Sequence, residues 1–301
     1  MSPDLMKKLA KPMLLAAALI WGTSFVVMKN ALDALPAFYL VAFRFTLGSL
    51  ILAVVVGKGW RSFAPDYLWR GAVSGFILFL VYAAQTYGLI YTTPSKNAFL
   101  TAVYCVIVPF LAWAALKRRP DRYNVLAAAL CIAGVGLVSL NERLTINIGD
   151  LLTLLGALLC AVNLIGVVVL SKGKDVILFT VFQFFFTGLY CWAAGALVED
   201  FPLQAFQDPA VVWAVLYLSV MCTAVAMLFQ NIGMVWTEPA AAAILLSLES
   251  VTGVIFSVLF YGDPVNARLL IGFALIFVAV ICSETKFSFL RRRAKDTMID
   301  G

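Results

Sequence analysis

Residues 85–100 read QTYGLIYTTPSKNAFL, and residues 230–245 read QNIGMVWTEPAAAAIL. With a constant offset of 145, the two stretches share six of sixteen residues, among them Gln85, Gly88 and Pro94. Chance similarity between two apolar helices would rest on leucine and alanine rather than on glutamine, glycine and proline. A recurring stretch of this kind indicates an internal repeat, which has to be recognised before the fold is assigned.

The composition around these stretches is that of a membrane protein. The chain has 301 residues, of which 63% are apolar and 13% charged, against about 45–50% and about 25% in soluble domains. The apolar residues recur in stretches near twenty residues long, the length of a helix that crosses about 30 Å of hydrocarbon. We therefore predict an all-α integral membrane protein with ten transmembrane helices. The predicted spans are 13–31, 37–56, 70–91, 95–114, 123–140, 150–171, 176–197, 210–231, 240–260 and 267–284.

The repeat divides the ten spans into two sets of five. With an offset of 139, Phe43-Arg44-Phe45 falls on Phe182-Gln183-Phe184. Because five is odd, the second copy must cross the membrane in the opposite direction to the first. The predicted units are a first five-helix repeat at 1–146, an inverted second repeat at 147–290 and a basic tail at 291–301. Inverted repeats are typical of secondary transporters, whose binding sites lie near the midplane between the halves.

The distribution of Lys and Arg predicts the orientation. With ten spans and a cytoplasmic N-terminus, seventeen basic residues lie on the cytoplasmic side and four on the other side. This bias follows the positive-inside rule. We expect a multi-pass protein of a bacterial-type plasma (inner) membrane, with both termini cytoplasmic. Basic clusters beside spans favour lipid headgroups over nucleic acid as their partner.

Several classes of chemistry are excluded or disfavoured. The chain has no histidine, so histidine triads and histidine metal ligands are excluded. The six cysteines lie in separate apolar stretches without a C-x-x-C pair, which is typical of small buried side chains. We predict no metal, no cofactor and no enzyme activity, with a membrane-embedded transferase as the less favoured alternative. Pro109, deep in the fourth span, predicts a kink there.

Several motifs resemble the EamA-like branch of the drug/metabolite transporter superfamily over essentially the whole chain. They are Ala18-Leu-Ile-Trp21-Gly22-Thr-Ser24-Phe, Phe43-Arg44-Phe45, Leu248-Glu249-Ser-Val, and Gly262-Asp263-Pro264 before Gly272-Phe-Ala-Leu-Ile-Phe. The resemblance implies ten helices in two five-helix repeats. It also implies that the helices carrying Arg44 and Glu249 line a central cavity.

Arg44 and Glu249 are the clearest charged residues inside predicted spans. A charge at mid-membrane costs about 2.5–3.5 kcal/mol on insertion scales, so it needs a partner or a wet cavity. At 1.5 Å of rise per residue, Arg44 lies about 10 Å and Glu249 about 16 Å from the outer side. One interpretation is a buried ion pair between the halves. The other is a site where Arg44 binds a carboxylate and Glu249 an ammonium group or a coupling proton.

Eight further residues inside spans are candidates for contact with the substrate. They are polar or aromatic, and for each the alternative is a hydrogen bond between helices. These residues are Trp21, Ser24, Tyr82, Gln85, Tyr104, Asn163, Gln183 and Gln230.

The predicted function is export of a small metabolite, an amino acid or related zwitterion, by alternating access through a central cavity. A carrier for organic cations, drugs or lipid-like molecules is the alternative. The predicted partners are the small-molecule substrate, membrane lipid and protons as coupling ion, in a monomer or homodimer.

Overall fold

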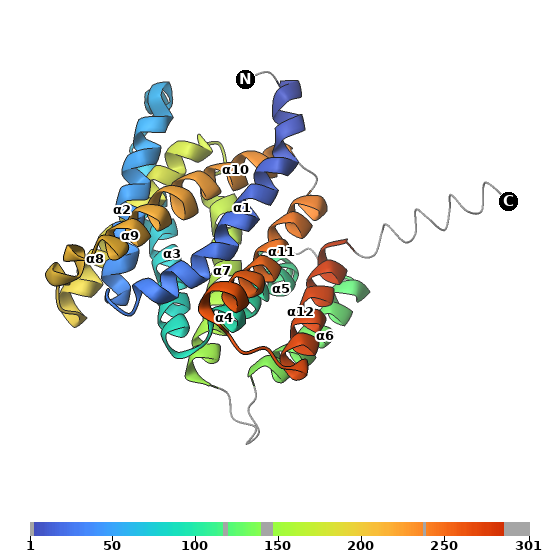
Figure 1. Cartoon of the computed structure of the whole chain (residues 1–301). Coiled ribbons are helices and arrows are strands. Elements are labelled where there is room, and N and C mark those ends of the chain that lie inside the picture. The colour runs from blue at the N-terminus through green and yellow to red at the C-terminus, as the bar shows by residue number, and fades with distance from the viewer. Residues whose placement is uncertain (1–2, 117–119, 140–146, 237–238, 286–301) are drawn as a thin grey trace.

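The computed structural model describes residues 3–116, 120–139, 147–236 and 239–285, and every element in these ranges is helical (Figure 1). The first half contains α1 (Pro3–Ala31), α2 (Ala37–Val56), η1 (Gly57–Ser62), α3 (Asp66–Tyr91), α4 (Pro94–Ala102), α5 (Tyr104–Leu116) and α6 (Arg122–Ser139). The second half contains α7 (Ile148–Leu170), α8 (Val176–Val198), η2 (Leu203–Gln207), α9 (Pro209–Tyr217), η3 (Leu218–Val225), α10 (Ala226–Trp236), α11 (Pro239–Phe256), η4 (Ser257–Tyr261) and α12 (Ala267–Thr285).

The ten predicted spans are confirmed. Each corresponds to one helix or to a run of consecutive helices: α4 with α5, α9 with η3 and α10, and α11 with η4. Within the described ranges, seven helices are long and apolar enough to cross a membrane, and three shorter apolar helices complete the set. The chain is therefore an all-helical membrane protein.

Polar caps determine where several of these helices begin. The Asp175 carboxylate accepts hydrogen bonds from the amides of Ile177 and Leu178 at the start of α8. Asp208 does the same at the start of α9, where Pro209 occupies the first helical position. Such side chains satisfy amides that have no partner inside the helix. The apolar spans thus end at the capped loops rather than running together.

Equivalent helices of the two halves pack against each other in opposite directions. Ser49, late in α2, donates to the carbonyl of Val181, early in α8, at 3.0 Å. Tyr39, early in α2, lies against Gly195, late in α8. Helices α2 and α8 are counterparts in the repeat, so their antiparallel packing is the geometry that an inverted repeat requires.

Helices α6 and α12 are a second antiparallel pair of counterparts. Asn124 Nδ2, early in α6, donates to Ser283 Oγ, late in α12, at 3.1 Å. A Cβ on Gly134 would lie 2.9 Å from the carbonyl oxygen of Gly272, and a Cβ on Gly272 would lie 3.1 Å from that of Gly134. The two glycines therefore make a reciprocal contact, which allows the backbones to approach closely.

The fourth span is divided into two helices. Helix α5 runs through Pro109, and the break lies at Val103 between α4 and α5. The amide of Val103 bonds to the carbonyl of Leu100, and the amide of Val106 bonds to that of Val103. In both hydrogen bonds the amide and the carbonyl are three residues apart, which gives a tighter turn than that of an α-helix.

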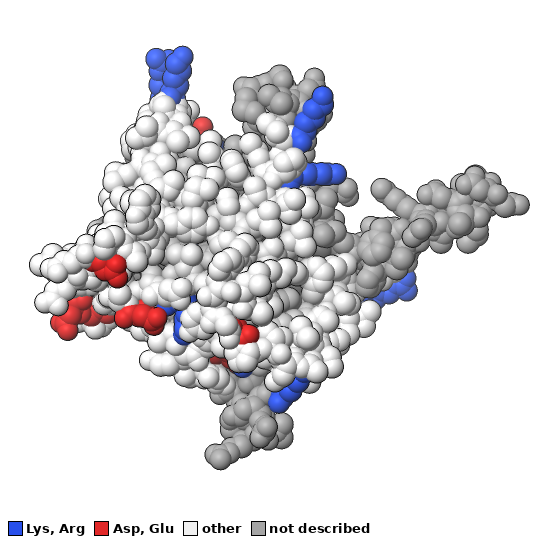
Figure 2. Space-filling view, in the orientation of Figure 1, with Lys and Arg blue, Asp and Glu red and all other residues white. Residues whose placement is uncertain are grey.

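Charged side chains lie near the two ends of the molecule, and Lys, Arg, Asp and Glu are absent from the broad band between them on the face that Figure 2 shows. The acidic side chains at one end lie over α8 and α9, whose connection contains Glu199, Asp200 and Asp208. An uncharged band between charged ends is the surface that a bilayer requires.

Candidate functional site

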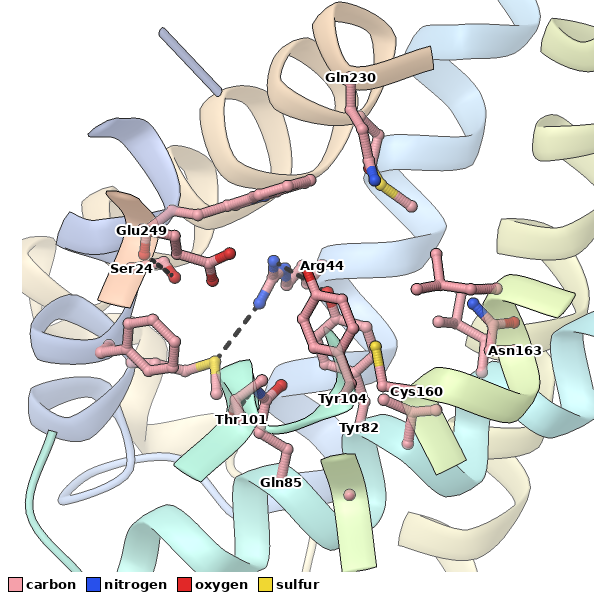
Figure 3. Close-up of a pocket in the computed structure, with 18 residues that line it drawn as sticks. Ser24, Arg44, Tyr82, Gln85, Thr101, Tyr104, Cys160, Asn163, Gln230 and Glu249 are labelled. Atoms are coloured by element: carbon pink, nitrogen blue, oxygen red, sulfur yellow. Dashed lines mark hydrogen bonds between the residues drawn. The ribbon is translucent and has the colours of Figure 1, made fainter. Parts of the chain in front are cut away.

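A cavity of about 120 Å³ lies between the two repeats (Figure 3). It is formed by side chains from α1, α2, α3, the α4–α5 span, α7, α10 and α11. Nine of the ten candidate residues line it: Trp21, Ser24, Arg44, Tyr82, Gln85, Tyr104, Asn163, Gln230 and Glu249. A cavity of this size holds several waters, since one water needs about 10–15 Å³.

Arg44 reaches the cavity from α2 and is 3% exposed. Its Nε donates to Thr223 Oγ1 at 2.6 Å, and its Nη2 donates to the Tyr82 hydroxyl at 3.4 Å. Its Nη1 lies 3.4 Å from the sulfur of Met28. The guanidinium carbon is 4.9 Å from the centre of the Tyr82 ring, a cation–π distance. Of the five N–H donors of arginine, two have no partner among the described residues.

Glu249 faces the same cavity from α11. Its carboxyl group makes no hydrogen bond or ion pair with a described residue. Figure 3 shows this group directed across the cavity toward the Arg44 guanidinium, without a contact between them. Within the described ranges the two residues are therefore not paired, since an ion pair requires a nitrogen and an oxygen within 4.0 Å. An acidic and a basic side chain thus border one space.

The lining of the cavity follows the sequence repeat. The offsets of 139 and 145 pair lining residues with other lining residues. The pairs are Trp21 with Cys160, Ser24 with Asn163, Phe25 with Leu164, Tyr82 with Met227, Gln85 with Gln230, and Tyr104 with Glu249. Figure 3 shows Gln85 and Gln230 at opposite ends of the cavity. The charges break this symmetry, because Glu249 is paired with a tyrosine and Arg44 with Gln183.

Gln183 is the candidate residue that does not line the cavity. Its Nε2 donates to Ser74 Oγ at 2.8 Å and to Asn163 Oδ1 at 3.1 Å, and the side chain is 2% exposed. Asn163, by contrast, borders the cavity. Gln183 therefore contacts a residue of the cavity lining without bordering the cavity itself.

The hydrogen-bonding groups of Trp21 and Ser24 are already engaged. The Trp21 indole donates to the carbonyl of Cys222 at 2.7 Å, and the Ser24 hydroxyl donates to the carbonyl of Trp21 at 2.7 Å. The Gln85 side chain donates to Thr101 Oγ1 at 3.0 Å. From the sequence, the alternative to contact with the substrate was a hydrogen bond to another part of the protein, and all three side chains make such a bond. The same three side chains also border the cavity.

The sequence did not single out several residues of the site. Applying the repeat offsets to Trp21 and Tyr82 would have found Cys160 and Met227. Met28 lies one helical turn beyond Ser24 on the same helix. Thr223, which holds Arg44, has no such signal, because its position depends on the π-helical turn η3.

Among the described residues, no group of three or more Cys, Asp or Glu side chains is arranged to hold a metal ion. The cavity is instead bordered by a carboxyl group, a guanidinium group and side-chain amides. This set can bind a polar solute by charge and hydrogen bonding.

Comparisons with known proteins agree with this architecture. The sequence model of the EamA-like transporter family matches residues 9–140 and 147–285, one match in each half. An uncharacterized transporter of Archaeoglobus fulgidus is 31% identical over 265 residues, which cover 88% of this chain and 82% of the relative. The uncharacterized transporter YetK of Bacillus subtilis is 25% identical over 284 residues, covering 89% and 86%.

A solved crystal structure is also similar, with a TM-score of 0.68 and 17% identity over 93% of this chain and 98% of that one. At this identity the likeness shows the fold alone. The family match covers both halves, and the archaeal relative aligns over most of both chains. The chain therefore belongs to the EamA-like transporter family of the drug/metabolite transporter superfamily and is a multi-pass membrane transporter rather than an enzyme.

Proposed function

We propose that this transporter is a secondary carrier that exports a small zwitterionic metabolite, an amino acid or a close analogue, by alternating access. The observation that carries the proposal is the pair of opposite charges that face one cavity without contacting each other. Arg44 comes from the first repeat and Glu249 from the second. A ligand with one charge of each sign would satisfy both side chains at once.

The chemistry of each side chain suits one end of such a ligand. The free N–H groups of Arg44 can bind a carboxylate by charge-assisted hydrogen bonds. Glu249 has no described partner and can accept hydrogen bonds from an ammonium group. An unpaired charge inside a membrane is expensive, so occupancy by a zwitterion would relieve the cost for both residues. Because the chain has no histidine, Glu249 is also the natural group for a coupling proton.

The size and charge of the cavity favour this substrate over the alternatives. A volume of about 120 Å³ is well below the 300–1,000 Å³ typical of pockets for drug-sized ligands. An organic cation without a carboxylate would leave Arg44 uncompensated beside it. The inverted repeat supports alternating access, since related halves can open the cavity to either side by the same motion.

The first test is a ligand screen with the purified full-length protein. A compound that binds only the folded state raises the melting temperature by mass action. The panel contains the twenty common amino acids, tetraalkylammonium ions and lysophospholipids. We expect stabilisation by at least one amino acid. Stabilisation by the ammonium ions or lipids alone would contradict a zwitterionic substrate.

The second test measures uptake of the stabilising amino acid into proteoliposomes. Arg44→Ala and Glu249→Gln should each reduce transport efficiency by about tenfold or more, because each removes a charged hydrogen-bond partner. Arg61→Ala, an exposed arginine in η1, serves as the matched control and should transport normally. Wild-type rates in both cavity variants, at normal expression, would overturn the proposed site.

A further inference from the structure

The eighth span contains a π-helical turn, η3 (Leu218–Val225), next to the cavity. π-Helical turns are rare inside α-helices and occur frequently at functional sites. Trp21 donates to the carbonyl of Cys222 in this turn at 2.7 Å, and Arg44 Nε donates to Thr223 Oγ1 at 2.6 Å. The turn therefore contacts α1 and α2 through two neighbouring residues.

The hydroxyl of Thr223 is oriented as an acceptor for Arg44. Its Oγ1 donates its own proton to the carbonyl of Leu218, five residues earlier, at 2.9 Å. In an α-helix a threonine bonds back three or four residues, so the five-residue spacing matches the wider π turn. With its proton bound to Leu218, the oxygen presents its lone pairs to Arg44. Thr223 is 1% exposed and does not line the cavity.

A glycine on α2 makes room for this contact. Gly48 lies one helical turn after Arg44, and a Cβ there would come within 2.7 Å of Thr223 Cγ2. The absent side chain lets the π turn approach α2 closely enough for a short bond to Nε. Gly48, Thr223 and the π turn thus together allow one hydrogen bond, from Arg44 Nε to Thr223 Oγ1.

We propose that Thr223 is a positioning residue for Arg44. By binding Nε, it fixes the plane of the guanidinium so that the Nη groups face the cavity. This inference rests on the proposed function, in which Arg44 binds the carboxylate of the substrate. Because Thr223 belongs to the second repeat and Arg44 to the first, movement of one repeat against the other changes the direction of the Arg44 donors.

The kinetic test compares two substitutions at one site. Thr223→Val keeps the shape and removes the acceptor, whereas Thr223→Ser keeps the hydroxyl. For uptake of the amino acid chosen by the screen, Thr223→Val should raise KM about tenfold, the effect of a lost hydrogen bond to a charged group. Thr223→Ser should retain a KM near wild type.

The matched control is Thr187→Val in α8. Thr187 is buried like Thr223, but its hydroxyl bonds to the carbonyls of Gly75 and Gln183. This variant should leave KM unchanged. An equal rise of KM in both valine variants would mean a general loss of packing and would overturn the proposal.

A double mutant separates this inference from the proposed function. If Thr223 acts through Arg44, adding Thr223→Val to Arg44→Ala should not raise KM further, because the two effects are not additive. If Arg44→Ala has no effect, the proposed function fails. If Arg44→Ala impairs uptake and Thr223→Val does not, only the positioning role fails.

A measurement without substrate tests the contact itself. In protein labelled with ¹⁵N-arginine, the Arg44 Nε–H signal is identified by its loss in Arg44→Lys. Its hydrogen exchange should be slow in the wild type and in Thr223→Ser, and about tenfold faster in Thr223→Val, where the bond is absent. Equal exchange rates in wild type and Thr223→Val would overturn the proposal.

Discussion

At the scale of residues, most polar groups inside the spans are bonded to other parts of the protein. The Trp21 indole, the Gln85 amide and the Gln183 amide each have a partner on another segment. Arg44 retains free donors, and the Glu249 carboxyl group has no described partner. Other buried side-chain atoms without a hydrogen-bond partner, at Thr86, Ser95 and Asn97, do not line the cavity. Arg44 and Glu249 are set apart because each can carry a charge, which is costly in hydrocarbon without a partner, and because both border the cavity.

The Trp21 bond predicts a loss of stability on removal of the indole. Trp21→Phe leaves the Cys222 carbonyl without this donor, which should lower the free energy of unfolding by about 1–3 kcal/mol. Thermal unfolding of purified protein in detergent measures the effect. Trp213→Phe, at a side chain that is 71% exposed, is the control. Equal melting temperatures for both variants would contradict the structural role of the bond.

At the scale of elements, the helices followed from the sequence but their interruptions did not. Runs of apolar residues predicted the spans. The break at Val103 and the π turns η3 and η4 lie inside apolar runs that show no local signal. Thr223 illustrates the reason, because its bond to Arg44 joins residues far apart in the chain. Interruptions of this kind depend on contacts between spans.

The close packing of α6 on α12 predicts that a side chain at position 134 lowers the stability of the protein. In Gly134→Ala the added Cβ would lie 2.7 Å from Ile276 Cγ1 and 2.9 Å from the carbonyl oxygen of Gly272. Overpacking of this kind typically costs about 1–3 kcal/mol, measurable as a lower melting temperature in detergent. Gly166→Ala is the matched control, since its nearest neighbour would be at 3.6 Å. A Gly134→Ala protein as stable as the control would contradict the close approach of the two helices.

At the scale of the whole molecule, a symmetric frame holds an asymmetric set of charges. The counterpart helices pack in the antiparallel pairs α2–α8 and α6–α12, and residues of both halves line the cavity. The positions equivalent to Arg44 and Glu249 in the other repeat hold uncharged residues, Gln183 and Tyr104. A symmetric frame can open to both sides of the membrane. One basic and one acidic side chain would give a zwitterionic ligand one preferred orientation in the cavity.

The orientation in the membrane is a prediction that labelling can test. The excess of Lys and Arg places η1 on the cytoplasmic side and η2 outside. In intact cells, an impermeant maleimide should therefore label Gln204→Cys, whereas Lys58→Cys should react only after permeabilisation. Both positions are exposed, and five of the six native cysteines are buried, with Cys160 partly so. The reverse pattern of labelling would contradict the predicted topology.

The sequence by itself determined the membrane fold, the ten spans and the repeat, and it singled out the two charged residues that border the cavity. These features depend on composition, on the length of apolar runs and on local caps, all of which act along the chain. Only the tertiary structure decided that Gln183 lies behind Asn163, that Arg44 is held by Thr223, and that Arg44 and Glu249 are not paired. Those outcomes depend on distances of a few ångströms between helices, which are set by close packing at glycines and by π turns rather than by any local pattern.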